Sequence, residues 1–275
     1  GDDGQVLTST GSGVAWEAAG GGASSINDLS DAKTFGTSSV MLGDATTGTI
    51  DAANYNTGLG IDVFAALTSG DNNVAVGFAA LDANTTGYLN VAVGGNALGS
   101  NVVGLGCTAL GDSALADNTN SYNTAVGRSA LANNTSADSN TAVGSIALFT
   151  NTTGASLVGI GESALNANTT GSFNTAVGRG SLAGCTTGGY NVAIGDSAMG
   201  AAAHTGNYNT AVGRSALRLI TTGSSNCGVG LAAGDAITSG NSNVFIGEGS
   251  GQSNTTGSEN TFVGWHAGQS ASDYS

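Results

Sequence analysis

A five-residue motif that returns every 17 residues dominates this 275-residue chain. Residues 123–127 read Asn-Thr-Ala-Val-Gly, and the same motif stands unchanged at 140–144, 174–178 and 209–213. With conservative changes, its closing glycine occurs fourteen times: Gly43, Gly60, Gly77, Gly94, Gly111, Gly127, Gly144, Gly161, Gly178, Gly195, Gly213, Gly230, Gly247 and Gly264. The steps are 17 residues, apart from one of 16 and one of 18. A fixed period of this length is typical of stacked coils and excludes an ordinary globule.

Each position counted from this glycine, taken as position 0, has its own chemistry. Position −1 is always Val, Leu or Ile, and position −3 is Val or Thr except at Cys227. Aliphatic residues two apart predict one face of a short strand, and the Ala or Gly usually found at −2 makes its other face small. The small residue at +3 and the following Leu or Met predict a second short strand. Positions +8 to +10 are typically Thr-Thr-Gly, which indicates a tight turn.

Asparagine occupies position −4 in eleven of the fourteen coils. Equivalent residues of stacked coils lie above one another, so we expect these amides to form a hydrogen-bonded ladder that satisfies a buried turn. The absence of Pro agrees with this arrangement, because every coil must donate its N–H groups to a neighbour.

Two further columns carry charge and aromatic rings. At +1, Arg179 stands between Glu162 and Asp196, with Arg214 next and with Asp112 beside Arg128 earlier in the chain; alternating signs predict weak attraction between coils. Aromatic residues cluster at −5 or −6, and three fall in consecutive coils: Phe173, Tyr190 and Tyr208. We expect these rings to stack. One interpretation is that they cover the coil edge or an interface between subunits; the other is a glycan-contacting stripe, because aromatic rings offer flat apolar faces.

These columns together predict an all-β fold, a parallel β-solenoid or β-roll of about fourteen 17-residue coils covering residues 37–275. At strand spacing such a rod is about 65 to 70 Å long. Because the first strand is apolar or small on both faces, we expect a homotrimer, with the −2 column buried between subunits or inside the coil. Residues 1–36 lack the period and are interpreted as an N-terminal adaptor or linker with a flexible stretch at 20–25. Phe245 and Phe262 at −2 predict a changed cross-section in the last coils.

The repeat resembles a known family of fibres. Its Asn-Thr-Ala-Val-Gly-x-x-Ala-Leu pattern with Asn-Thr-Thr-Gly spacers is similar to repeats of phage tail fibres and bacterial surface proteins that often precede an endosialidase-type chaperone domain. Residues 191–195, Asn-Val-Ala-Ile-Gly, resemble the repeat of trimeric autotransporter adhesin heads, which are left-handed parallel β-rolls with a shorter period. Residues 4–16 are also similar to tail-fibre segments.

This resemblance implies a non-catalytic fibre on a virion or an extracellular cell surface. The implied partners are copies of the chain itself, other fibre or baseplate proteins, and a cell-surface glycan or receptor.

The composition argues against several other classes of protein. A formal net charge of −14 with five basic residues leaves little to bind nucleic acid or an anionic membrane, and no apolar run reaches bilayer length. Three cysteines without metal-type spacing predict small buried or half-buried residues. His204, in a turn, is expected to face solvent.

The acidic residues are scattered, so we expect no enzyme, catalytic residue, metal or cofactor. Two alternatives stay open: an ice-binding solenoid using the Thr-Thr column at +8 and +9, and a polysaccharide-degrading fibre.

Overall fold

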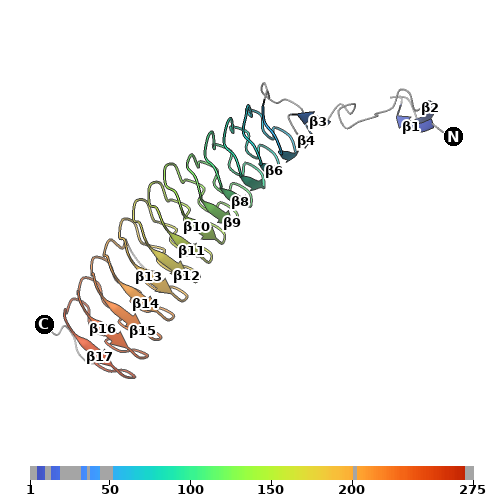
Figure 1. Cartoon of the computed structure of the whole chain (residues 1–275). Helices are drawn as coiled ribbons and strands as arrows, with labels where there is room; N and C mark the ends of the chain where they lie inside the picture. The colour runs from blue at the N-terminus through green and yellow to red at the C-terminus, as the bar shows by residue number, and fades with distance from the viewer. Residues whose placement is uncertain are drawn as a thin grey trace.

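The computed structural model describes residues 5–9, 14–18, 32–35, 38–43, 52–200 and 203–269. Within these ranges the chain has strands and turns but no helix. Figure 1 shows the coils stacked in one row, with their strands following one another along one side of the rod. The stretch at 20–25, for which we expected flexibility, lies outside the described residues.

The described residues form two sheets. In the first, β1 (Gln5–Ser9) pairs antiparallel with β2 (Val14–Ala18). The second has fifteen strands: β3 (Ala32–Phe35) pairs antiparallel with β4 (Ser39–Leu42), and β4 to β17 pair parallel in chain order. The remaining strands have three residues each: β5 (Thr57–Leu59), β6 (Val74–Val76), β7 (Val91–Val93), β8 (Thr108–Leu110), β9 (Thr124–Val126), β10 (Thr141–Val143), β11 (Val158–Ile160), β12 (Thr175–Val177), β13 (Val192–Ile194), β14 (Thr210–Val212), β15 (Cys227–Val229), β16 (Val244–Ile246) and β17 (Thr261–Val263). The predicted all-β parallel solenoid is confirmed, with fourteen parallel strands bounding about thirteen turns.

The strand register follows the repeat, including the two irregular coils. Ala142 pairs with Ala125 on one side and with Gly159 on the other, so the −2 column is continuous. Across the 16-residue step Thr108 still pairs with Thr124, and the 18-residue step likewise keeps the pairing of β13 with β14. The missing and extra residues are therefore absorbed outside the strands.

The glycine at position 0 is required by both conformation and space. Gly144 has a φ of +137°, a region that residues with a side chain rarely adopt. A Cβ on Gly144 would lie 2.5 Å from the carbonyl oxygen of Gly161 in the next coil. Because the coils approach this closely, a side chain in this column would push them apart, which explains why the glycine recurs.

The second strand predicted after the glycine is wrong: each coil holds one strand, and turns follow it. Residues at +2 and +4 adopt left-handed backbone conformations, with φ of +51° at Ile146 and +54° at Leu148. These conformations are uncommon for bulky side chains. They nevertheless direct N–H groups along the rod, because Ile146 donates to Arg128 O in the preceding coil and Leu148 donates to Ala164 O in the following one. The segment thus bonds coil to coil without being extended.

A thin apolar core fills each coil. The −2 residue of every strand from β5 to β16 is buried, and Ala142 has no exposed surface. The Leu at +4 packs against it from the opposite side of the coil, as Leu148 does in the same cluster. Of the two places predicted for the −2 column, the structure gives the coil interior.

The predicted asparagine ladder at −4 is confirmed. Asn140 Nδ2 donates to Gly154 O at 3.0 Å, and Asn140 Oδ1 accepts from the N–H of Leu157 at 2.9 Å. The same pattern links Asn226 to Asn243 in a later pair of coils. Each buried amide therefore holds its own turn and the next coil together.

A second asparagine ladder runs at +7, and it was not predicted from the sequence. Asn151 Nδ2 donates to Asn134 Oδ1, and Asn168 Nδ2 donates to Asn151 Oδ1, both at 2.8 Å. All three side chains are fully buried. The signal was visible in the Asn-Thr-Thr-Gly spacers, whose asparagine falls at this position.

Candidate binding and assembly surfaces

The outer face of the parallel sheet is an apolar stripe along the rod. We define it as the residues at −1 and −3 of strands β4 to β17. These side chains alternate with the buried −2 residues and point away from the core. Ile160 and Ile194 expose 39% and 41% of their surface, and Leu59 exposes 51%. A contiguous apolar surface of this length is unusual on a monomer and marks an interaction surface.

The predicted aromatic ladder is confirmed. Phe173 stacks on Tyr190 with ring centroids 4.8 Å apart, and Tyr190 stacks on Tyr208 at 5.1 Å. All three residues have a φ near +60°. In this single chain they expose 51%, 51% and 62% of their surface. Because the rings stack face to face, their exposed edges form a short row along the rod, which is suited either to a ligand or to a partner subunit.

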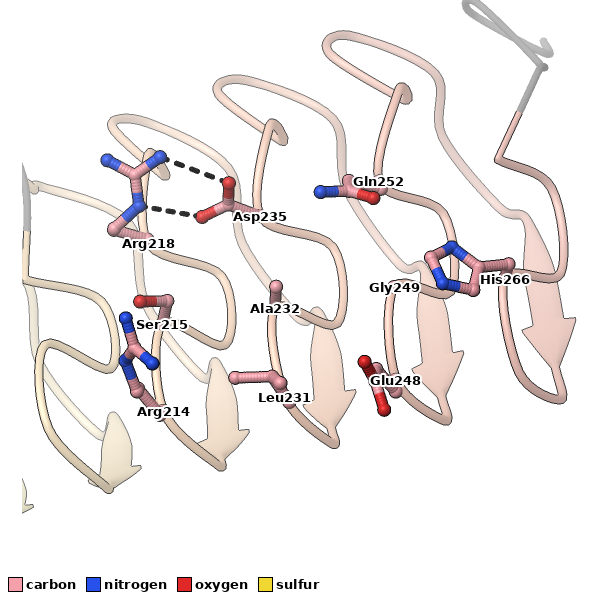
Figure 2. A pocket seen from close by; sticks show the side chains of 10 residues that line it. All are labelled: Arg214, Ser215, Arg218, Leu231, Ala232, Asp235, Glu248, Gly249, Gln252 and His266. Carbon is pink, nitrogen blue, oxygen red and sulfur yellow. Dashed lines mark hydrogen bonds and ion pairs between the residues drawn. The ribbon is translucent and has the colours of Figure 1, made fainter.

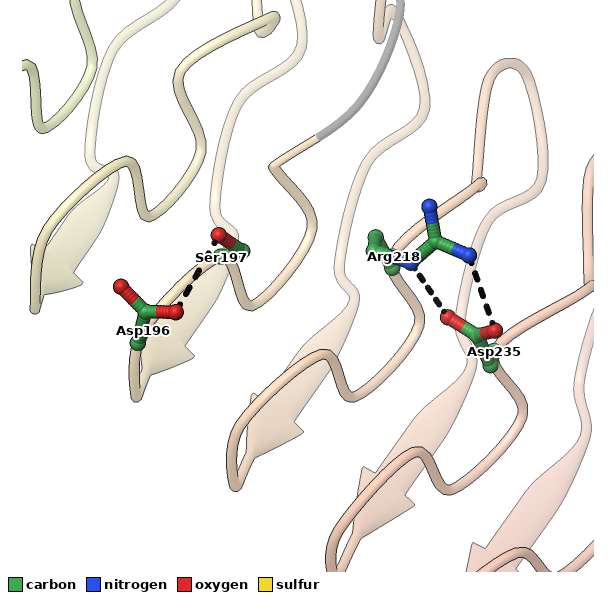
Figure 3. Close-up of polar contacts among 4 residues, drawn as sticks. All are labelled: Asp196, Ser197, Arg218 and Asp235. Carbon is green, nitrogen blue, oxygen red and sulfur yellow. Dashed lines mark hydrogen bonds and ion pairs between the residues drawn. The ribbon is translucent and has the colours of Figure 1, made fainter.

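The charge column at +1 is confirmed in one pair. Arg179 Nη2 lies 2.8 Å from Asp196 Oδ1, with both side chains substantially exposed. Within the described residues no other ion pair joins members of this column. An exposed pair of this kind contributes little stability. Asp196 also accepts a long hydrogen bond of 3.5 Å from Ser197 Oγ (Figure 3).

A stronger ion pair, absent from our sequence-based predictions, lies at +5. Arg218 Nε and Nη2 donate to the two carboxylate oxygens of Asp235 at 2.8 and 3.0 Å (Figure 3). This bidentate hydrogen bonding raises the pKa of Arg218 above its ordinary value. The two residues are 17 positions apart, so the pair clamps consecutive coils.

This ion pair forms part of a groove of about 440 Å³ near the C-terminal end of the rod. Figure 2 shows two rows of side chains along the rod axis. The first row is Arg214, Leu231 and Glu248 at +1, and the second is Arg218, Asp235 and Gln252 at +5. Between them the +2 column forms a floor of Ser215, Ala232 and Gly249, and His266 closes its end.

The prediction that His204 faces solvent is wrong. The residue is fully buried, and its backbone forms a parallel bridge with Cys185. Its Nε2 lies 3.4 Å from Asn209 Nδ2, whereas Nδ1 has no hydrogen-bond partner. Burial lowers the pKa of His204 to about 4, so the imidazole is neutral at physiological pH. The 18-residue coil misled the prediction, because its extra residue obscures which position turns inward.

The cysteines are free thiols: Cys107 and Cys185 are buried and Cys227 is half-buried, as predicted. Burial raises the pKa of Cys185 to about 12, which keeps this thiol protonated and unsuited to nucleophilic attack.

Among the described residues, no three His, Cys, Asp or Glu side chains lie together in a group that could hold a metal ion. Nor do those residues include a helix with the length and apolar character needed to cross a membrane. Comparisons with protein-family models, curated proteins and solved structures give no match to this chain.

Proposed function

We propose that this chain is the rod of an attachment fibre, which forms a homotrimer through the apolar stripe and carries contacts for a host surface. The observation that supports this proposal most directly is the stripe itself, because it follows the sheet strand after strand without a charged residue at −1 or −3. The setting that fits is a phage tail fibre or another extracellular appendage. Other fibre or baseplate proteins would then bind at its ends.

Closed three-fold packing explains how the stripe is covered. The strands follow one another along one side of the rod (Figure 1), and the residues at −1 and −3 are Val, Ile, Leu and Thr apart from Cys227, so each chain offers a continuous face of aliphatic residues and threonines. Burying this face stabilises an assembly by roughly 25 cal/mol for each Å² of apolar surface. Closed cyclic symmetry covers the stripe and stops growth, whereas open lateral association would continue indefinitely.

The assembly is tested by placing charge on the stripe. Ile160→Glu together with Ile194→Glu puts two carboxylates at positions that a partner would cover, and such burial of unpaired charge is strongly unfavourable. Thr153→Arg is the matched control, since this exposed turn residue lies away from the strands.

Sedimentation equilibrium should give a trimer mass for the wild-type protein and the control, and a monomer mass for the double variant. A monomeric wild-type protein would refute the homotrimer.

Attachment through the aromatic ladder is the second part of the proposal. Phe173, Tyr190 and Tyr208 lie on adjacent coils and stack face to face, so the ladder presents ring edges that can contact the apolar parts of a sugar, while the tyrosine hydroxyls form hydrogen bonds. Their exposure in the single chain leaves them accessible unless a partner subunit covers them. A structure of the assembled fibre with these rings buried would end this part of the proposal.

The alternatives have weaker support. The threonines at +8 already donate their hydroxyls between coils, as Thr169 Oγ1 does to Thr186 O at 3.0 Å, so they do not form a free array for ice. Measurable thermal hysteresis in purified protein would restore that alternative.

A depolymerase requires a carboxylate pair. In the groove Asp235 is bound to Arg218, which leaves Glu248 as the carboxylate without an ion-pair partner in the described structure. Release of reducing sugar from a capsular polysaccharide would favour the enzyme.

A further inference from the structure

We infer that the groove between the +1 and +5 rows binds a neutral oligosaccharide. This inference rests on the proposed attachment function and adds a second contact site with its ligand class. The groove differs from the rest of the rod in holding two of the chain's four arginines, Arg214 and Arg218, on a strongly acidic protein. Its small floor leaves room for a ligand lying along the rod axis (Figure 2).

The accessible polar groups of the groove define the ligand's hydrogen bonding. The Arg214 guanidinium and the Glu248 carboxylate belong to exposed residues, and the Gln252 amide belongs to a half-buried one, so all three can contact a ligand. Guanidinium only donates, carboxylate only accepts, and an amide does both. A ligand that satisfies all of them must donate and accept along its length. Hydroxyl groups do this, whereas a phosphate or carboxylate only accepts.

The charge of the groove points to a neutral ligand. Arg214 and Arg218 are balanced by Asp235 and Glu248, so the formal charge of the four side chains is zero. An anion drawn to Arg214 would also meet Glu248, two coils or ~10 Å away at strand spacing. Asp235 further neutralises Arg218 through the bidentate pair. The groove is therefore no general anion site.

Apolar surface completes the fit to a sugar ring. Leu231 lies between Arg214 and Glu248 in the same row and exposes 43% of its surface. Trp265 follows Glu248 at +1 in the last coil, where its ring meets the His266 ring edge-on with centroids 4.3 Å apart. Trp265 is 76% exposed, so its ring can pack against a ligand beside the groove. Pyranose rings combine C–H faces with hydroxyl edges, which matches this surface.

The test uses the full chain with Trp16→Phe, which leaves Trp265 as the single tryptophan. This parent is first applied to an array of neutral hexose and N-acetylhexosamine oligosaccharides together with sialylated and uronate-containing ones. The neutral oligosaccharide that binds most tightly is then titrated by Trp265 fluorescence and by calorimetry. We expect a neutral ligand, a fluorescence change on binding, and a tenfold or greater loss of affinity in Arg214→Ala.

A groove-filling variant separates blocked binding from misfolding. Ala232→Ile fills the floor, and Ile146 already occupies the equivalent +2 position with nearly the same φ, +51° against +53°. Ser163→Ile places the same isoleucine at +2 in a coil outside the groove and should keep full affinity. Ala232→Ile should lose tenfold or more while its thermal unfolding stays cooperative.

Three results would overturn the inference. Binding that survives Arg214→Ala and Ala232→Ile but disappears with Tyr190→Ala and Tyr208→Ala assigns recognition to the aromatic ladder, and the attachment function stands. Selective binding of acidic oligosaccharides contradicts the ligand class. If the parent binds nothing on the array, the groove site and the glycan part of the proposed function fall together, while the trimer measurement still decides the fibre.

Discussion

The middle coils and the C-terminal coils fill the same interior space with large side chains at different positions of the repeat. In the middle, Ala142 and Ala176 at −2 face Leu at +4. Near the C-terminal end, Phe245 and Phe262 occupy −2, and +4 is glycine at 234, 251 and 268. A Cβ at Gly234 would lie 2.4 Å from a ring carbon of Phe245, and one at Gly251 would lie 2.1 Å away. The large side chain therefore stands at +4 in the middle coils and at −2 in the C-terminal coils.

The exchange also appears near the other end of the rod. Gly58 stands at −2, where an added Cβ would approach the ring of Phe64 at +4 to 3.2 Å. The backbone path and strand register are unchanged across all these coils. What the fold conserves is therefore the volume enclosed by a coil, as close packing requires. The sequence predicted a changed cross-section in the last coils. In the structure, the change lies in whether the residue at −2 or the residue at +4 fills the interior.

A double-mutant cycle at Gly234 and Phe245 tests this compensation and carries the largest expected effect. Phe245→Ala leaves a cavity and should cost about 3 to 5 kcal/mol. Gly234→Leu forces a side chain into the ring and should cost about 1 to 3 kcal/mol. The double variant restores the pairing of the middle coils, so it should be more stable than Phe245→Ala alone.

Urea unfolding of the four proteins gives the coupling energy. If the losses in unfolding free energy of the two single variants simply add in the double variant, positions 234 and 245 do not compensate for one another. The proposed exchange of volume between the regions would then be wrong.

The interior polar column differs between the regions as well, and His204 lies near the transition. Asn118, Asn134, Asn151 and Asn168 fill +7 in the earlier coils; Cys185, Ile220 and Ile237 follow later, before Asn254 restores the asparagine. The folded pKa of His204 is depressed from 6.5 to about 4, so the unfolded chain binds this proton more readily. Its contribution to stability is present above pH 6.5 and is lost as the pH falls towards 4, a change of about 3 kcal/mol.

His204→Gln removes this titration while keeping a polar side chain. Between pH 7 and pH 4 the wild-type protein should lose more unfolding free energy than His204→Gln. The carboxylates are the same in both proteins, so their titration does not contribute to this difference. A pH-independent difference would mean that His204 is protonated in the folded state or exposed to water.

Sequence reasoning succeeded where a column is repeated many times. The glycine at position 0, the asparagine at −4 and the stacked aromatic residues could be predicted because each of these residue types has one main structural role in a stacked coil. It failed where backbone conformation departs from side-chain preference. Leu148 and Ile146 do not favour positive φ, and nothing in their identity distinguishes a left-handed turn from a strand. The groove was hidden because it needs three columns across four coils, none of which is unusual by itself.

Substitutions at +7, in the asparagine part and in the apolar part of the column, should have an intermediate effect on the free energy of unfolding. Asn151→Ile removes three hydrogen bonds of 2.8 to 2.9 Å and leaves Asn134 Oδ1 buried with fewer donors, so a loss of about 1 to 3 kcal/mol is expected. Ile220→Val, in the apolar part of the column, should cost about 0.5 to 1.5 kcal/mol. Chemical denaturation measures both. Equal stability of Asn151→Ile and wild type would show that the ladder specifies register without stabilising the rod.

The smallest effect on stability should come from the aromatic ladder, which lies outside the coil. Tyr190→Ala with Tyr208→Ala removes a stack of exposed rings, and such stacking contributes about 0.5 to 1.5 kcal/mol beyond burial. Unlike Phe245, these rings do not fill the coil interior, so their removal should leave the proposed trimer and the cooperative unfolding of the chain intact. If the ladder contacts glycan, the same variant should lose attachment to target cells in a pull-down or adsorption assay. Phe245→Ala should instead lower stability first and attachment only through unfolding. If the double tyrosine variant instead dissociates into monomers, the ladder lies at the subunit interface. The rings would then stabilise packing between subunits, as Phe245 stabilises packing inside the coil.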